Sequence, residues 1–165
     1  MRNETTGPAL EVLLGLLDEA FERKSWHGTN LRGSLRGLPA KQAAWRPGPR
    51  RHNIWEIAVH AAYWKYAVRR RLSGEKRGSF VLPGSNWFLR AGTGGEAAWK
   101  ADLALLVDEH RRLRAVVEAL DEANLERVAA GASGKTTNVT LIRGIAAHDL
   151  YHAGQIQLLK RLRES

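Results

Sequence analysis

Apolar side chains recur every three or four residues in four long segments of the chain, a spacing typical of amphipathic helices. The segments run from about 8 to 24, from 53 to 72, from 93 to 120 and from 138 to 162. No stretch alternates apolar and polar residues as a half-buried strand does. The pattern therefore predicts an all-α fold. Because each helix is long enough to cross a small domain, it favours a four-helix bundle with long ordered loops.

Three of the predicted helices have a capping signal at the N-terminus. Thr6 precedes the first helix and can accept a hydrogen bond from its free backbone N–H groups. Asn53 with Glu56, and Thr93 with Glu96, have the spacing of a capping box. We therefore expect helices to start beside these residues.

The predicted loops are long and differ in character. Residues 25–52 are rich in Gly and Pro and can hold a short helix around 30–36. Residues 75–95 contain Trp87 and Phe88, two apolar side chains that are costly to leave in water, so this loop is expected to be ordered. Both loops are long enough to cross over a bundle, so the order of the helices stays open.

The chain has 165 residues, the size of one domain, so residues 1–165 are expected to fold as a single unit. No apolar run approaches the roughly 18 residues that a membrane span needs. The N-terminus lacks the basic, apolar and small-residue regions of a secretory signal. These features predict a cytoplasmic protein that does not bind membranes.

The formal net charge is +9, which raises the question of nucleic-acid binding. The basic residues are mostly arginines scattered along the chain, without a long polybasic tail, and no zinc-finger, RNP or phosphate-loop motif occurs. A solvated, arginine-rich helical surface explains the charge more simply. Specific nucleic-acid binding is the least favoured hypothesis.

The chain contains no cysteine and six histidines. This composition excludes disulfides, Cys-ligated zinc, iron–sulfur clusters and a thiol nucleophile within the chain. Histidine and carboxylate side chains are therefore the plausible ligands for a transition metal.

His148 and His152 form an HxxxH pair on the last predicted helix, where residues four apart lie on one face about 6 Å apart along the axis. They share a stripe predicted to face the interior with Leu141, Ile145, Ile156 and Leu159. Two buried imidazoles are costly without partners, and a shared metal ion satisfies both. His60, on the inward face of the second helix, is a candidate third ligand. Three protein ligands leave a position for water or substrate, as in catalytic sites.

Other interpretations stay open. An inward histidine is more often a hydrogen-bonded core residue than a metal ligand. The His148–His152 motif differs from the zinc-protease motif HExxH by the shorter Asp149, and little chain follows it to supply another ligand. Asp149 can still accept a hydrogen bond from a metal ligand, but we expect it to pair with an arginine on a neighbouring surface.

Four further side chains have weaker assignments. Gln155 projects on the ligand face and can orient a metal-bound water or substrate, which makes it a candidate catalytic residue, although a backbone-bonded Gln is nearly as good an interpretation. His110 is expected to be a neutral core histidine and His52 to be exposed. His27, in a Gly-flanked loop, is a minor candidate for substrate contact.

Two segments carry a resemblance to a known family. Ile54-Trp55-Glu56-Ile57-Ala58-Val59-His60-Ala61-Ala62-Tyr63-Trp64, followed by His148-Asp149-Leu150-Tyr151-His152-Ala153-Gly154-Gln155-Ile156, resembles the DinB/YfiT-like family of metalloenzymes, which is distinct from the DNA polymerase of similar name. The resemblance extends over about 26–162. It implies a four-helix bundle, often a homodimer, with a divalent ion such as zinc or nickel held by His60, His148 and His152.

The resemblance implies two kinds of chemistry on a small-molecule substrate. Characterised relatives include S-transferases that use the low-molecular-weight thiol bacillithiol, a mycothiol-dependent isomerase and metal-dependent hydrolases. The thiol would come from outside this cysteine-free chain. No carboxylate base accompanies the histidines on the predicted inward faces, which slightly favours a bound thiol or a Lewis-acid role. A non-catalytic metal-binding or ligand-binding bundle is the alternative.

Overall fold

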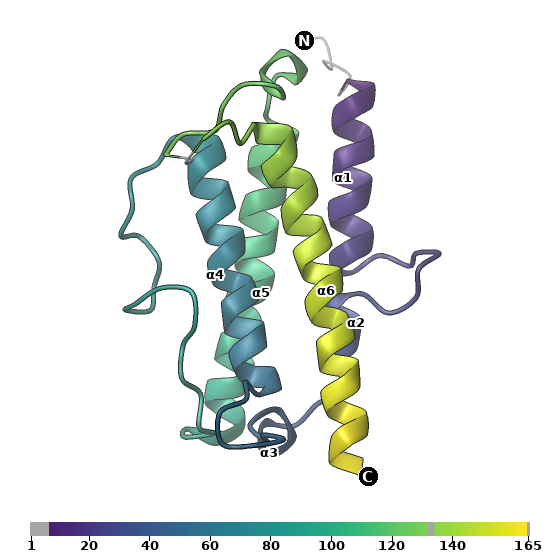
Figure 1. Cartoon of the computed structure of the whole chain (residues 1–165), viewed down its shortest axis with the longest axis vertical. Coiled ribbons are helices and arrows are strands. Elements are labelled where there is room, and N and C mark those ends of the chain that lie inside the picture. The colour runs from purple at the N-terminus through teal and green to yellow at the C-terminus, as the bar shows by residue number, and fades with distance from the viewer. Residues whose placement is uncertain (1–6, 132–133, 165) are drawn as a thin grey trace.

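The computed structural model describes residues 7–131 and 134–164, and every regular element in these ranges is helical (Figure 1). The elements are α1 (Pro8–Phe21), α2 (Leu31–Leu35), α3 (Ala40–Ala43), α4 (Ile54–Ser73), α5 (Gly95–Glu118), the 3₁₀-helix η1 (Glu122–Asn124) and α6 (Asn138–Glu164). The prediction of an all-α fold is confirmed. The short helix predicted around 30–36 is present as α2, whereas α3 was not predicted.

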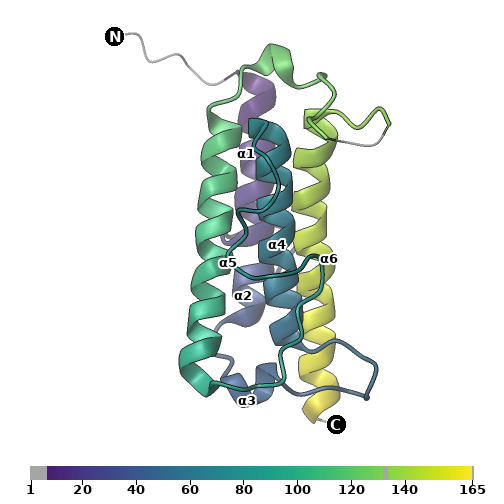
Figure 2. The same ribbon diagram turned by 90° about the vertical axis from the view of Figure 1, so that its left-hand side faces the viewer.

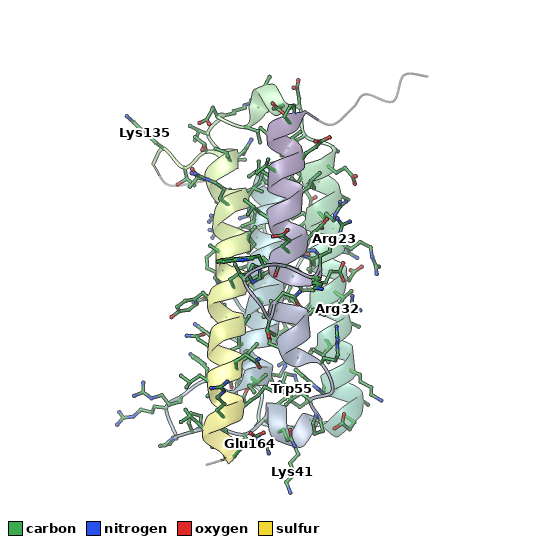
Figure 3. All side chains as sticks on the ribbon, turned by 90° about the vertical axis from the view of Figure 1, so that its right-hand side faces the viewer. Arg23, Arg32, Lys41, Trp55, Lys135 and Glu164 are labelled. Carbon is green, nitrogen blue, oxygen red and sulfur yellow. The ribbon has the colours of Figure 1, made fainter. Side chains whose placement is uncertain are left out.

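The four long helices α1, α4, α5 and α6 lie side by side (Figures 1 and 2). α4 packs against α5 and α6, and α1 packs against the same two helices from the other side. α2 follows α1 after a non-helical connection and continues the same column (Figure 3). The helix order that the sequence left open therefore places α4 diagonally opposite α1.

The start and the end of α1 differ from the prediction. The helix begins at Pro8, and its backbone N–H groups are satisfied from another part of the chain, because Ala9 N donates to Glu122 Oε2 at 3.1 Å. Thr6, the predicted cap, lies outside the described residues. α1 ends at Phe21 rather than near residue 24.

One predicted capping box is half correct. Asn53 caps α4, since its Oδ1 accepts a hydrogen bond from Glu56 N at 2.8 Å. The Glu56 carboxylate does not accept a hydrogen bond from the backbone N–H of Asn53. It accepts from Arg46 and from the backbone N–H of Arg90 instead. Asn53 therefore acts as a single cap.

The second predicted capping box is wrong. α5 begins at Gly95, after Gly94 in a left-handed conformation with φ 88°, and no side chain caps it. Glu96 Oε1 instead accepts a hydrogen bond from Ala40 N at 2.6 Å. The carboxylate thus supports the start of α3 rather than that of its own helix.

α4 is buried on almost every side because the chain between α4 and α5 crosses its outer face (Figure 2). Phe88 in this loop is 6% exposed, and Phe80 and Trp87 pack against the same core. The prediction that this loop is ordered and packs against the core is therefore confirmed. Within the described ranges, no helix is both long and apolar enough to cross a bilayer.

Candidate metal centre

Three histidines from the neighbouring helices α4 and α6 lie close together. His60 comes from α4, and His148 and His152 come from successive turns of α6. The Nε2 atom of His148 lies 3.2 Å from that of His60 and 3.1 Å from that of His152. One nitrogen of each ring lies within 4.8 Å of the others. The structure thus brings together the three residues that the sequence singled out, in an arrangement that could hold a metal ion.

The second nitrogens of two rings are held by oxygen atoms. His60 Nδ1 lies 2.8 Å from the backbone oxygen of Asn86, and His152 Nδ1 lies 2.7 Å from Gln155 Oε1. Because both oxygens are amide carbonyls and can only accept, each Nδ1 carries a proton and each Nε2 keeps its lone pair. Both lone-pair nitrogens lie beside His148 Nε2, which can donate one proton at most. A shared cation satisfies all three nitrogens.

Burial keeps the cluster neutral. The pKa of His60 is lowered to about 4 and that of His148 to about 3, mainly by burial and in part by the neighbouring histidines. Burial also lowers the pKa of His152. The neutral imidazole is the form that binds metal ions, so the rings are ready for coordination at neutral pH.

The loop between α4 and α5 positions His60 in two ways. The Trp87 ring stacks on the His60 ring with centroids 3.8 Å apart. Asn86, with φ 65°, adopts a left-handed conformation that aims its carbonyl at His60, and its side-chain oxygen accepts a hydrogen bond from Trp64 Nε1. The sequence marked Trp87 as a buried loop anchor but did not connect either residue with the histidines.

His52 lies on the other face of Trp87, with ring centroids 3.6 Å apart. Its Nδ1 lies 3.0 Å from Glu56 Oε2. Burial favours the neutral acid at Glu56, but hydrogen bonds from Arg46, Arg90 N–H and His52 outweigh it and lower the pKa of Glu56 to about 2. His52 is exposed, as predicted, but it is also paired with a permanent carboxylate.

A cavity of about 550 Å³ adjoins the cluster. Its lining includes His52, Trp87, His152 and Gln155. The remaining lining is largely apolar and comes from α4, α6 and the preceding loop: Pro47, Gly48, Arg51, Ile57, Tyr151, Leu158, Leu159 and Leu162. A molecule with an apolar body can therefore reach His152, the one member of the three-histidine cluster that lines the cavity.

The remaining predictions have mixed outcomes. His110 is a core residue, stacked on Phe21, and burial lowers its pKa to about 2, which confirms a neutral histidine. Asp149 is fully buried and pairs with Lys65 Nζ at 2.5 Å, so its predicted surface position is wrong. His27 lies exposed in the loop after α1, outside the three-histidine cluster.

The fold and the cluster define an all-helical protein with a candidate three-histidine metal site. The sequence profile of the DinB superfamily matches residues 24–156, which include all three histidines. Because this match covers well over half of the chain, the protein belongs to the DinB superfamily, as the resemblance predicted.

A comparison of structures finds the same fold in a solved protein. The fold is similar to that in the crystal structure of a conserved protein from Enterococcus faecalis, with a TM-score of 0.68 and 15% sequence identity. The alignment covers 92% of this chain and 95% of the other. At this identity the likeness shows the fold alone. No protein of curated function matches the sequence.

Proposed function

We propose that this protein is a metal-dependent enzyme acting on a small molecule, with a divalent ion held by His60, His148 and His152. The observation that carries the proposal is the convergence of the three Nε2 atoms, two of which keep lone pairs because Nδ1 is hydrogen-bonded elsewhere. Three neutral imidazoles suit zinc or nickel among the divalent metals.

Such an ion would lower the pKa of a bound water toward about 7 or hold a low-molecular-weight thiol as thiolate, which corresponds to hydrolase or thiol S-transferase chemistry. The chain has no cysteine to supply a thiol. Among the described residues, the one group of three or more potential ligands that meets consists of the three histidines, and it includes no carboxylate that could act as a base.

The chain's own residues supply binding and proton transfer in this proposal. The apolar walls of the adjoining cavity bind the body of the substrate. Gln155 keeps His152 in place through Nδ1. His52 moves a proton at Nε2, because its Nδ1 is held by the Glu56 carboxylate and its ring faces the same cavity as His152.

Metal analysis of the purified full-length chain tests the binding step. Protein prepared without chelator and supplied with zinc or nickel should hold about one ion per chain. His60→Ala, His148→Ala and His152→Ala should each lose most of this binding. His27→Ala, which changes an exposed histidine, is the matched control and should keep it. A wild type with no more metal than the triple alanine variant would refute the proposal.

Activity screens of metal-loaded protein test the catalytic step. The panels contain esters, amides, and a thiol paired with an electrophile. His52→Phe keeps the ring that stacks on Trp87 but cannot move a proton, so turnover should fall by roughly 10²–10⁴-fold with metal content unchanged. Consistent inactivity of the metal-loaded wild type would favour the binding-bundle alternative.

A further inference from the structure

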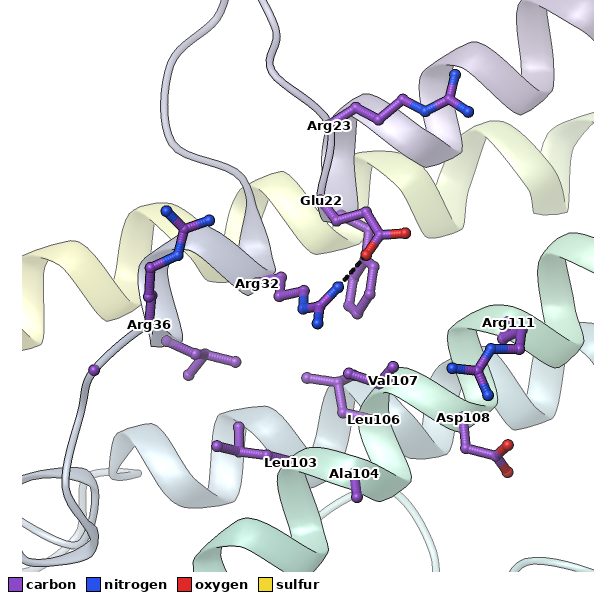
Figure 4. Close-up of a pocket in the computed structure, with 13 residues that line it drawn as sticks. Glu22, Arg23, Arg32, Arg36, Leu103, Ala104, Leu106, Val107, Asp108 and Arg111 are labelled. Atoms are coloured by element: carbon purple, nitrogen blue, oxygen red, sulfur yellow. Dashed lines mark hydrogen bonds and ion pairs between the residues drawn. The ribbon is translucent and has the colours of Figure 1, made fainter.

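A second cavity, of about 940 Å³, lies between α5 and the column formed by α1 and α2 (Figure 4). α1 ends at Phe21 and α2 begins at Leu31, while α5 continues unbroken alongside both. α2 packs against α6 and α1, which leaves room between α2 and α5. This cavity shares no lining residue with the cavity beside the three histidines.

The floor of the second cavity is apolar. Phe21, Leu35 and Leu106 are almost fully buried beneath it. Leu103 and Val107, on successive turns of α5, are only half-buried and border the cavity (Figure 4). A floor of this kind gains free energy when the apolar body of a ligand displaces water from it.

The rim of the second cavity carries four arginines and two acids: Arg23, Arg32, Arg36, Arg111, Glu22 and Asp108. Both carboxylates already form ion pairs with arginines. Glu22 pairs with Arg32, as Figure 4 shows, and Asp108 pairs with Arg112 at 2.8 Å. Arg23 pairs with Asp18 at 3.3 Å. Two of the four arginines therefore have no acidic partner and give the mouth an excess of positive charge.

Two guanidinium groups account for this excess. The side chains of Arg36, at the end of α2, and Arg111, on α5, make no hydrogen bond or ion pair with any part of the chain that the structure describes. Both are exposed, so their positive charge is available to a ligand. A guanidinium group matches the planar fork of a carboxylate with two parallel hydrogen bonds.

We propose that this second cavity binds a small amphipathic carboxylate. The apolar body lies on the floor at Leu103 and Val107, and the carboxylate is held at the rim by one of the two free guanidinium groups, which lie at opposite ends of the cavity (Figure 4). The apolar floor favours a ligand with an apolar body, and the excess positive charge at the rim favours a negatively charged head group. This binding site is separate from the three histidines and does not depend on the proposed function.

Octanoate tests the proposal, with 1-octanol and octylammonium as probes that share the same chain length. Each is titrated into the ¹⁵N-labelled full-length protein, and amide shifts locate the site. Octanoate should bind saturably, with the largest shifts between residues 103 and 111 and in α2. The two other probes should bind at least about tenfold more weakly, as expected for the loss of charge-assisted hydrogen bonds.

Three variants locate the binding. Arg36→Glu with Arg111→Glu reverses the charge of the rim, and Ala104→Phe fills the cavity from an exposed position of α5; each should weaken octanoate binding about tenfold or more. Arg51→Glu is the matched control, because Arg51 lines the other cavity. Equal binding of 1-octanol would overturn the proposal. Binding that is lost only in Arg51→Glu would overturn it as well.

Discussion

At His152, the hydrogen bond made by Nδ1 determines whether Nε2 has a lone pair free to bind a metal ion. Gln155 Oε1 lies 2.7 Å from Nδ1, so Nε2 keeps the lone pair that faces His148. The backbone oxygen of Asn86 has the same effect on His60. Oxygen acceptors behind metal-binding histidines fix the ring orientation and make the coordinating nitrogen more basic.

Replacing Gln155 tests this dependence directly. Gln155→Leu removes the acceptor at similar volume and should weaken zinc affinity by roughly 10–100-fold, measured by competition with a chromophoric chelator. Gln155→Glu restores an acceptor and should keep most of the affinity.

Gln157→Leu is the matched control, because Gln157 is on the same helix but bonds weakly to Thr29 at 3.5 Å, away from the histidines. Its zinc affinity should equal that of the wild type. If Gln155→Leu also left the affinity unchanged, Gln155 would have no positioning role.

Some of these residues follow from sequence and others do not. His148 and His152 were predictable because helix geometry places residues four apart on one face. Asn86 and His52 belong to non-helical chain, where no periodicity relates sequence position to direction. Asp149 was placed on the surface because a charged residue is rarely buried unless it is paired, and its partner lies on another helix.

At the scale of elements, α4 and α6 are joined by a buried ion pair. Lys65 and Asp149 are both fully buried, and Lys65 Nζ also lies 3.2 Å from His110 Nδ1. Removing one partner of a buried pair leaves an uncompensated charge. Lys65→Met should therefore lower the free energy of unfolding by about 3–5 kcal/mol, measured by urea denaturation of metal-free protein.

The double variant separates charge from packing. Lys65→Met with Asp149→Leu removes both charges and should recover most of the lost stability. On the surface of α5, Arg112→Met breaks an exposed pair with Asp108 and a longer one, of 3.7 Å, with Glu109, which keeps its bond to Arg69; the loss should be less than about 1 kcal/mol. A double variant as unstable as Lys65→Met alone would show that packing, not unpaired charge, causes the loss.

The loop over α4 depends on one unusual residue. Asn86 is the non-glycine residue with positive φ among those described, at 65°. Asn86→Ala should lower the free energy of unfolding by about 1–2 kcal/mol, because alanine tolerates this conformation poorly. Asn86→Gly accepts the conformation and should cost less, apart from the lost bond to Trp64. The unfolding midpoints of the two variants give the comparison, and a greater loss in Asn86→Gly would contradict this account.

At the scale of the whole molecule, buried histidines make stability depend on pH. The pKa is lowered to about 4 for His60, about 3 for His148 and about 2 for His110, against about 6.5 in an unfolded chain. As pH falls, the unfolded chain therefore takes up protons first. Stability is fully present above about pH 6.5 and is lost progressively as pH falls toward 4 and below.

Urea unfolding of metal-free protein between about pH 7.5 and pH 4.5 measures this loss. His110→Leu should flatten the dependence, because it removes one buried histidine from the folded state. His27→Asn changes an exposed loop histidine and serves as the control. A free energy of unfolding that stays constant over this range would be inconsistent with buried neutral histidines.

The overall architecture was predictable only in part. Helical periodicity located the four long helices, because it depends on neighbouring residues alone. Their arrangement, and the gap that α2 leaves beside α5, depend on contacts between distant segments. The net charge of +9 was interpreted as a solvated surface, yet Arg69 and Arg70 are only 7% and 9% exposed. Ion pairing with Glu75 and Glu109 makes the burial of Arg69 possible.

The neighbouring positions of His148 and Asp149 limit how α6 can be placed along and around its axis relative to α4. Consecutive helical residues point about 100° apart, and here one meets His60 while the next meets Lys65. A shift of α6 by one residue would break both contacts at once. The two contacts together therefore favour one register of α6 against α4. In the Lys65→Met and Asp149→Leu double variant, only the contact between His148 and His60 still opposes such a shift, so α6 should move more than in the wild type even though stability recovers. Exchange broadening of its amide resonances, absent in the wild type, would reveal this.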